Sequence, residues 1–463
     1  MERKNAWAAY AEDDSRVEAF AKAYCDFINN GKTERECVAY GEKLAKAHGF
    51  EDLNAVIRSG RKLEAGARVY VNWMGKSFML FVLGAKPLEE GMNILGAHID
   101  SPRIDVKQNP LYEDGDLAYL DTHYYGGIKK YQWVAMPLAL HGVIIKKNGE
   151  KVPVNIGEDE NDPVFCISDL LIHLAQEQMA KNAKDVVEGE ALNLIVGGRP
   201  LAGEEKDAVK ANVLKLLDDK YGVEEEDFLS AELEIVPAGK ARDMGFDRSM
   251  ILGYGHDDRV CAYPSMMAVL DYEGTPDYTL CCIITDKEEI GSVGATGMAS
   301  HYLENTVAEL YACTADYCEL AVRRCLRNSR MLSSDVSAGY DPNFASAFEK
   351  KNSAFLGRGI CFNKFTGSRG KSGSNDANPE FMASLRKIMD DAGVAFQTAE
   401  LGRVDLGGGG TIAYLCAKYG MNVIVSGIAV LSMHAPYEII SKVDLYEGYR
   451  CYCAFLKGAK PVD

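Results

Sequence analysis

The chain has 463 residues, more than one hydrophobic core usually supports, so we expect two domains, one of them interrupted by the other. Lysine and arginine total 51 against 68 acidic residues, and the net charge of -17 argues against nucleic acid or an anionic membrane surface as a partner. Apolar residues make up 47%, yet the longest apolar stretch, residues 423–433, is well short of the roughly 20 residues that span a bilayer.

The sequence also indicates a reducing compartment. The first thirty residues carry charges throughout and lack the apolar core of a signal peptide. The 13 cysteines form no CxxC pattern and include the adjacent pair Cys281 and Cys282, which argues against a disulfide framework. We therefore expect a cytoplasmic protein with reduced thiols.

Two amphipathic helices are expected to open the chain. Apolar residues recur at helical spacing in the first of them: Val17, Phe20, Tyr24, Phe27 and Ile28. Thr33 and Glu36 form a capping box for the second helix, which we expect to end before Gly49. Residues 70–84 and 92–97 then favour strands, and the second run leads directly into His98.

The middle of the chain has a different character. Short strand-like runs at residues 132–147 precede a helical pattern at 167–182, and residues 183–231 are mostly polar helix and loop. We expect residues 102–245 to be a separate domain inserted into a first domain formed by residues 1–101 and 246–463.

From Gly253 onward strands and helices alternate, which is typical of an α/β domain. The expected elements are a strand at residues 279–285, a helix at 379–392, a strand at 422–429 and a C-terminal helix that begins at Val443.

Residues that can bind metal ions follow five of the expected strand ends. They are His98 with Asp100, His256 with Asp257 and Asp258, Glu288 with Glu289, Asp335, and His434. Ligands gather at the carboxyl ends of strands in open α/β sheets. A site for two cations needs a bridging carboxylate, about two further protein ligands for each metal, and a base that binds neither. The sequence contains these groups and therefore predicts a two-metal site.

Each of these residues also has an ordinary structural explanation. A histidine after an apolar strand is more often a satisfied polar residue than a ligand, and paired acids are usually solvated surface charges. Lys287 or Arg259 can also balance buried carboxylates in a purely structural network. The metal interpretation is favoured because five separate strand ends share one feature, which independent surface charges do not produce.

Seven segments stand out between about residues 70 and 440. In chain order they are GAHIDSPR, YYGGIKKYQW, GHDDRVCAYPS, DKEEIGSVGATG, SSDVSAGYDPN, GGGGTIA and SMHAPYE. Together they closely resemble the aspartyl aminopeptidase family of dinuclear zinc peptidases, in particular its bacterial branch. The resemblance implies an α/β fold, with a mixed-sheet zinc-peptidase domain that has helices on both faces and is interrupted by a β-rich dimerisation domain.

The same resemblance implies the metal ligands. His98 and Asp335 would hold one ion, Glu289 and His434 would hold the other, and Asp257 would bridge them. The family implies two zinc ions per subunit, and manganese or cobalt suits the same ligands.

The resemblance assigns further roles next to the metals. Glu288 would be the general base, and Asp100 would orient His98 by accepting a hydrogen bond from its distal nitrogen. The family does not require an acid at Asp258, which we interpret as structural.

The resemblance implies that the substrates are short peptides with a free N-terminus and an acidic first residue. Gly409, Gly410 and Thr411 belong to a glycine-rich loop that in the family brings backbone donors to the substrate. An acidic first residue would need a basic group in the specificity pocket, and the local candidates are Lys364, Arg369 and Lys371. Cys361 stands where better-known eukaryotic members place a pocket lysine, so strict acidic specificity is not expected unless Lys364 reaches in from its neighbouring position.

The family also implies a homo-oligomer, a tetrahedral dodecamer built from dimers. His173, on the expected helix 167–182, would then reach a neighbouring subunit's site, although a core or surface role is the more ordinary one. Two other functions remain open from the residues alone: a dinuclear amidase or deacylase of N-modified amino acids, and an inactive assembly or cargo protein of the same fold.

Overall fold

The computed structural model describes residues 4–368, 370–410 and 412–462, which divide into two compact units. The first comprises Met1–Asp100, Ala241–Met433 and Glu438–Asp463, and the second comprises Ser101–Lys240 and His434–Tyr437. The long segment of the second unit thus runs from 101 to 240, where the sequence suggested 102 to 245. The grouping of His434–Tyr437 with this unit was not anticipated.

A nine-stranded mixed sheet forms the centre of the first unit. Across the sheet its strands are β1 (Glu51–Asp52), β2 (Arg68–Trp73), β3 (Ser77–Val82), β13 (Thr279–Thr285), β4 (Met92–His98), β14 (Arg330–Ser333), β18 (Asn422–Gly427), β16 (Ile360–Asn363) and β17 (Phe396–Thr398). β13, β4, β14 and β18 run parallel, whereas β3 and β16 are antiparallel to their neighbours in this set. The carboxyl ends of the four parallel strands therefore meet at one edge.

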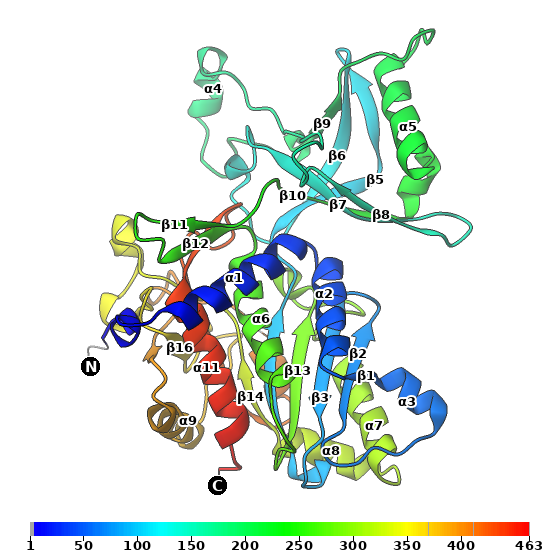
Figure 1. Ribbon diagram of the computed structural model, residues 1–463. Coiled ribbons are helices and arrows are strands. Elements are labelled where there is room, and N and C mark those ends of the chain that lie inside the picture. The colour runs from blue at the N-terminus through cyan, green and yellow to red at the C-terminus, as the bar shows by residue number, and fades with distance from the viewer. Residues whose placement is uncertain (1–3, 369, 411, 463) are drawn as a thin grey trace. The chain divides into compact units, whose positions relative to one another are not determined.

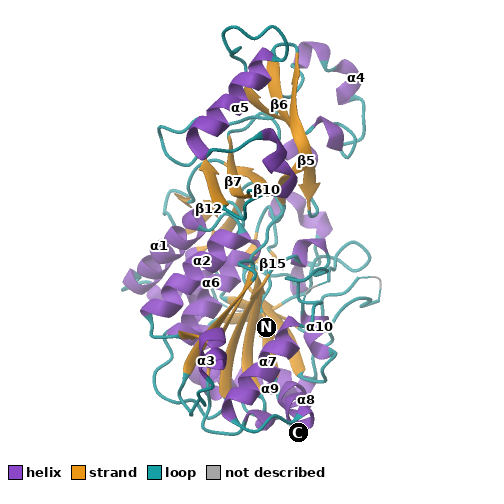
Figure 2. Cartoon of the chain, turned by 90° about the vertical axis from the view of Figure 1, so that its right-hand side faces the viewer, coloured by secondary structure: helices purple, strands orange, loops and turns teal. Residues whose placement is uncertain are grey.

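Helices cover both faces of this sheet (Figure 2). On one face lie α1 (Ser15–Asn30), α2 (Glu34–Ala47), α6 (His256–Leu270), α9 (Pro379–Ala392) and α11 (Lys442–Gly458); on the other lie α3 (Leu53–Ser59), α7 (Tyr302–Thr314), α8 (Glu319–Asn328) and α10 (Ala413–Ala417). Within β13, Cys282 and Ile284 pack into the first core, whereas Cys281 and Ile283 pack into the second. Burial on both sides explains why this strand is apolar between its terminal threonines, and the expected α/β fold is confirmed.

The expected opening helices are confirmed. The Thr33 side chain accepts from the backbone N–H of Glu36, and the Glu36 carboxylate accepts from the N–H of Thr33, so the capping box is complete. The run at residues 70–84, however, is two strands, because Met74 and Gly75 turn the chain in left-handed conformations between β2 and β3.

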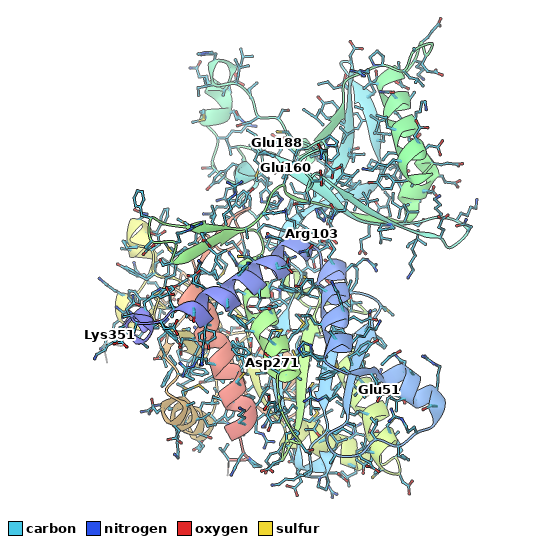
Figure 3. The ribbon with its side chains drawn as sticks, viewed as in Figure 1. Glu51, Arg103, Glu160, Glu188, Asp271 and Lys351 are labelled. Carbon is cyan, nitrogen blue, oxygen red and sulfur yellow. The ribbon has the colours of Figure 1, made fainter. Side chains whose placement is uncertain are left out.

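Two small sheets and the last helix complete the first unit. β12 (Met250–Gly253) pairs with β11 (Arg242–Met244) and β20 (Glu438–Ser441), and β15 (Ser337–Ala338) pairs with β19 (Ala429–Val430). Asp271, at the end of α6 (Figure 3), accepts a hydrogen bond of 2.9 Å from the Tyr449 hydroxyl of α11.

In the described part of the chain, no helix combines the length and apolar character needed to cross a membrane.

The second unit is built on a six-stranded antiparallel sheet (Figure 1). Across the sheet its strands are β8 (Lys151–Ile156), β7 (Leu138–Ile145), β10 (Ala231–Pro237), β5 (Arg103–Asp114), β6 (Leu117–Tyr125) and β9 (Leu194–Gly197). The helices of this unit are the short α4 (Gln176–Met179) and α5 (Ala208–Tyr221). The inserted region is thus rich in β-strands.

The helix expected at residues 167–182 is wrong. This segment contains a single 3₁₀ turn, Ile172–Leu174, followed by the four-residue α4. Ile172, Leu174 and Met179 remain 66 to 68% exposed in the isolated chain. A short amphipathic helix is stable only when its apolar face is buried, and here these side chains do not reach the unit's core.

Candidate metal centre

The parallel strands bring several of the predicted residues to one edge of the sheet. His98 is the last residue of β4 and pairs with Thr285, the last residue of β13. The Glu288–Ile290 turn follows β13, and Asp335 follows β14 by two residues. Residues far apart in sequence therefore meet because their strands end at the same level.

Asp257 reaches the same place from α6. Gly255 has a left-handed backbone, with φ of 75°, and turns the chain between β12 and α6. The backbone N–H of Asp257 donates a hydrogen bond of 2.9 Å to the carboxylate of Glu438, and the following peptide bond to Asp258 is cis. The position of Asp257 is thus fixed by a buried contact with β20.

His98 lies at the centre of a group of carboxylates. Its Nε2 is 3.2 Å from Asp257 Oδ1, 3.9 Å from Glu288 Oε2 and 4.0 Å from Asp335 Oδ1. Ligand atoms of His98, Asp257 and Glu289 all lie within 4.8 Å of one another. The structure therefore brings together four of the five predicted metal ligands and the predicted base.

Asp258, which we had interpreted as structural, lies in the same group. It is fully buried, and its Oδ2 accepts a hydrogen bond of 3.3 Å from the backbone N–H of His98. It also offers a ligand atom within 4.8 Å of those of His98 and Asp335. Its position directly after Asp257 was the only sequence signal for this placement.

Asp100 connects the two loops of the site. Its two carboxylate oxygens accept hydrogen bonds of 3.1 Å from the backbone N–H groups of Glu288 and Glu289. The Nδ1 of His98 donates to the Asp100 carbonyl oxygen at 3.0 Å and lies 3.3 Å from its carboxylate. Because Nδ1 holds its proton against Asp100, Nε2 is the nitrogen left to bind a metal, which would displace the proton that Nε2 shares with the carboxylates.

Carboxylates outnumber the one imidazole in this group, and they shift one another's pKa values. Burial, together with the charges of Glu288 and Asp258, raises the pKa of Asp335 well above its usual value, and burial likewise raises the pKa of Asp258. Burial alone would lower the pKa of His98, but hydrogen bonds with Asp100 and Asp257 raise it well above its usual value. These shifts indicate surplus negative charge.

Lys287 and Arg259, the cations of the alternative structural network, donate hydrogen bonds to groups other than the predicted metal ligands. Lys287 Nζ donates to Asp286 at 2.9 Å. Arg259 donates to the backbone carbonyls of Ile99 and Lys32 at 3.1 and 2.9 Å. One imidazole among several buried carboxylates is a donor set that suits divalent cations such as zinc, so the residues fit the metals that the sequence predicts.

His434 belongs to the second unit. Its Nδ1 donates a hydrogen bond of 2.9 Å to the carbonyl oxygen of Gly127, so Nε2 is the nitrogen left to bind a metal. Its role as a metal ligand stays a prediction, which rests on this tautomer and on its place in the sequence.

The residues predicted to contact substrate have local contacts. Lys364 Nζ lies 3.1 Å from Asp376, which also binds Lys371 at 3.0 Å. The N–H of Gly409 donates to the carbonyl of Thr366 at 3.0 Å. Around them, parts of residues 365–371 and 400–408 line a cavity of about 270 Å³.

The other residues predicted to contact substrate are less informative. Gly410 is exposed. His173 is exposed in the 3₁₀ turn of the second unit. Arg369 and Thr411 lie outside the described residues. Cys361 is fully buried in β16, and burial raises the pKa of its thiol to about 12, so the side chain stays a neutral thiol.

Comparison with known proteins agrees with this geometry. The family model described as "Aminopeptidase I zinc metalloprotease (M18)" matches residues 27–456. "Probable M18 family aminopeptidase 1" of Clostridium acetobutylicum is 58% identical over 458 residues, which is 98% of each chain. The crystal structure of an M18 aminopeptidase from Thermotoga maritima is 42% identical and covers 99% of this chain and 100% of its own, with a TM-score of 0.94.

A more distant solved structure is similar in fold alone. It is the mApe1 dodecamer of S. cerevesiae, which is 21% identical and covers 96% of this chain and 97% of its own, with a TM-score of 0.76. Because the family model spans most of the sequence and the Clostridium protein matches it nearly end to end, the chain belongs to the aminopeptidase I (M18) family of zinc metalloproteases and is a metal-dependent aminopeptidase.

Proposed function

We propose that the chain releases N-terminal residues from short peptides by means of a water molecule activated by two divalent metal ions, with Glu288 as the general base. The observation that carries the proposal is the position of His98 Nε2, within 4.0 Å of carboxylate oxygens of Asp257, Glu288 and Asp335. These residues come from four different elements, and a surface cluster of acids would not surround a buried imidazole.

His98 and Asp335 would hold one metal, Glu289 and His434 the other, and Asp257 would bridge the two. Zinc is the metal named for the family, and manganese or cobalt suits the same ligands. When bound, such ions lower the pKa of a shared water and polarise the scissile carbonyl.

The chain's own residues would handle the proton. Glu288 is 14% exposed at its side chain and can meet both water and substrate. It would take a proton from the water and later give it to the leaving amine. Asp100 keeps the backbone of Glu288 in place through the hydrogen bond to its N–H, so the base is positioned before substrate arrives.

Selection for a free N-terminus follows from charge. Several carboxylates around one imidazole attract the cationic α-amino group of a peptide, whereas an N-acylated substrate lacks that charge. For an acidic first residue, Lys364 and Lys371 share Asp376, which leaves one net positive charge from two lysines and one aspartate. We expect a moderate preference for Asp or Glu, lowered by Lys364→Met while cleavage of peptides beginning with Leu is unchanged.

We further propose that the protein works as a homo-oligomer built from dimers through the inserted unit. Leu171, Ile172, Leu174 and Met179 are 54 to 68% exposed in one segment around His173. Several large apolar side chains exposed within one short segment favour an interface at that segment. Ile172→Asp should shift the assembly toward monomers in sedimentation velocity, whereas an unchanged assembly would place the interface elsewhere.

The experiment that tests the proposed function is the Glu288→Gln variant. We expect its kcat to fall by about 10²- to 10⁴-fold, the usual contribution of general base catalysis, with metal content by elemental analysis unchanged. Glu304→Gln, a charge change on α7, is the control. Full activity in Glu288→Gln would refute the mechanism.

Substrate profiling separates the proposal from the two other functions. Cleavage of N-acyl amino acids but not of free peptides, with zinc, manganese or cobalt supplied, would make the protein an amidase or deacylase. No turnover of either class by the metal-loaded wild type would make it an assembly or cargo protein.

A further inference from the structure

The opposite edge of the same sheet carries a second set of buried polar residues. Arg330, the first residue of β14, pairs with Asn93 of β4 and with Asn422 of β18. Residues two apart on a strand face the same side, and Leu332, two residues after Arg330, packs in the core beneath α9 and α11. Arg330 and the two asparagines thus form a polar row on that face, at the amino ends of the strands.

Arg330 is a buried cation with little compensation. Its side chain is among the largest that are fully enclosed, and the residue is 2% exposed. Nε donates to Asn93 Oδ1 at 2.6 Å, and the guanidinium carbon lies 4.2 Å from the centre of the Tyr278 ring. Among residues 4–368, 370–410 and 412–462, neither Nη1 nor Nη2 has a hydrogen-bond partner.

The neighbouring contacts do not remove this charge. Burial lowers the pKa of Arg330 to about 10, which still leaves it protonated at neutral pH. Tyr278 also accepts a hydrogen bond of 2.9 Å from Lys86, so a second cation shares this ring. A buried guanidinium normally has a carboxylate or phosphate partner in the plane of its nitrogens, because an unpaired buried charge is strongly destabilising.

A cavity of about 600 Å³ adjoins Arg330. Its lining includes two further arginines of the α8 segment, Arg324 and Arg327, and two acids, Glu89 and Glu90. Glu89 accepts a hydrogen bond from the Tyr311 hydroxyl at 2.9 Å, and Glu90 lies 3.8 Å from Lys86. Both acids therefore already have partners, whereas the three arginines give the cavity a positive surplus.

We propose that Arg330, Arg324 and Arg327 form a binding site for a small oxyanion, namely a sulfate, phosphate or carboxylate group. Arg330 supplies the two unpaired nitrogens, and the exposed Arg324 and Arg327 attract the anion at the mouth of the cavity. The row that contains Arg330 lies at the amino ends of β4 and β14, whereas the acidic group lies at their carboxyl ends, so this site is separate from the metal centre. The bound anion stabilises the native chain and takes no part in hydrolysis.

Thermal unfolding with increasing sodium sulfate, at ionic strength held constant with sodium chloride, tests the proposal. A ligand that binds only the folded state raises Tm in a saturable way. We expect such a rise in the metal-loaded wild type and its loss in Arg324→Gln/Arg327→Gln, with peptidase activity unchanged. The matched control is Arg323→Gln/Arg386→Gln, which removes the same charge from exposed positions outside the cavity lining.

Arg330→Met separates an anion site from a purely structural arginine. If Arg330 binds an anion, the Tm of the variant equals or exceeds the wild-type Tm without sulfate. At saturating sulfate the Tm of the variant is then lower than that of the wild type. A variant that is less stable than the wild type by the same amount at every sulfate concentration would overturn the proposal.

Two sources can supply an anion of this chemistry, a free ion or a carboxylate of the chain itself, and a deletion distinguishes them. Val462 lines the cavity and is followed in sequence by Asp463, whose carboxylate offers the same chemistry as a free anion. A sulfate response that appears only after deletion of Asp463 assigns the site to the chain's own carboxylate. A crystal soaked in selenate should show an anomalous peak beside Arg330 in whichever form responds; no response and no peak in either form would refute the site.

Discussion

The two ends of the parallel strands in the first unit carry opposite unbalanced charges. At their carboxyl ends, one histidine lies among buried carboxylates that include Asp257, Asp258 and Asp335. At the amino end of β14, the buried Arg330 adjoins a cavity with two further arginines. From this difference we infer that the two edges bind ions of opposite sign. Divalent cations would neutralise the carboxylates at the carboxyl ends, and an oxyanion would neutralise the arginines at the amino end.

The largest effect is expected from a substitution of Asp257, the residue proposed to bridge the two metals at the acidic edge. Asp257→Asn removes the charge shared by both metals, so we expect loss of bound metal and a fall in kcat of about 10³-fold or more, since metal ions contribute several kcal/mol to the transition state. Elemental analysis and steady-state kinetics measure both. Asp271→Asn, at the far end of α6, is the matched control, and a fully active Asp257→Asn would remove the two-metal assignment.

A smaller effect is expected at His434, the ligand proposed from the second unit. His434→Ala should lower metal content from about two equivalents to one and reduce kcat by about 100-fold, because one ion alone retains part of the charge stabilisation. His301→Ala changes an exposed histidine paired with Glu304 and serves as the control. Retention of both metals in His434→Ala would assign the second ion to other ligands.

A substitution of Asp100 tests whether the hydrogen bonds that hold the metal-binding residues in place contribute to metal affinity and kcat. In Asp100→Asn, one of the two backbone N–H groups of Glu288 and Glu289 would face an amide N–H in place of an oxygen. We expect a 10- to 100-fold loss in metal affinity or kcat, the usual cost of losing such a contact, with KM little changed. A change in KM alone would mean that Asp100 acts on substrate binding.

The smallest effect concerns two buried histidines in opposite surroundings. Burial lowers the pKa of His256, whose Nδ1 lies 2.7 Å from the Tyr24 hydroxyl, to about 3, whereas carboxylates raise the pKa of His98. Because the pKa of His256 is about 6.5 when unfolded, its contribution to stability is present above that pH and is lost as pH falls toward 3.

Urea unfolding of metal-free protein measures this contribution. Between pH 6.5 and pH 5 the wild type should lose about 2 kcal/mol more than His256→Gln, at about 1.4 kcal/mol per pH unit. Equal losses in the two proteins would mean that His256 is not the buried neutral group.

Sequence patterns predicted the first unit well because its elements follow local rules. The capping box at Thr33, the buried strand at 279–285 and the helix at 379–392 each carry their own signal, and all three are present. The parallel order of the strands then places His98 beside the loops after β13 and β14. The sequence suggested this placement only through the position of these residues at expected strand ends.

Other features depend on contacts that sequence spacing does not encode. Residues 167–182 have helical periodicity but no core to bury it against, so the periodicity was misleading. Asp258 was interpreted as structural, and its hydrogen bond to the backbone of His98 is such a role, but sequence spacing did not predict that it lies among the metal-binding residues. Arg330 carried no signal, because only the pairing of three strands places it in a polar row.

The register of β4 against β13 has a consequence for how this protein can change. His98 is paired with Thr285, and neighbouring residues on a strand point to opposite sides. Adding or deleting a single residue inside either strand would move the side chains beyond that point to the opposite face of the sheet. The polar ring of His98 would then lie in apolar packing. Length variation in descendants of this chain is therefore confined to the loops, where ligands can be repositioned without being inverted.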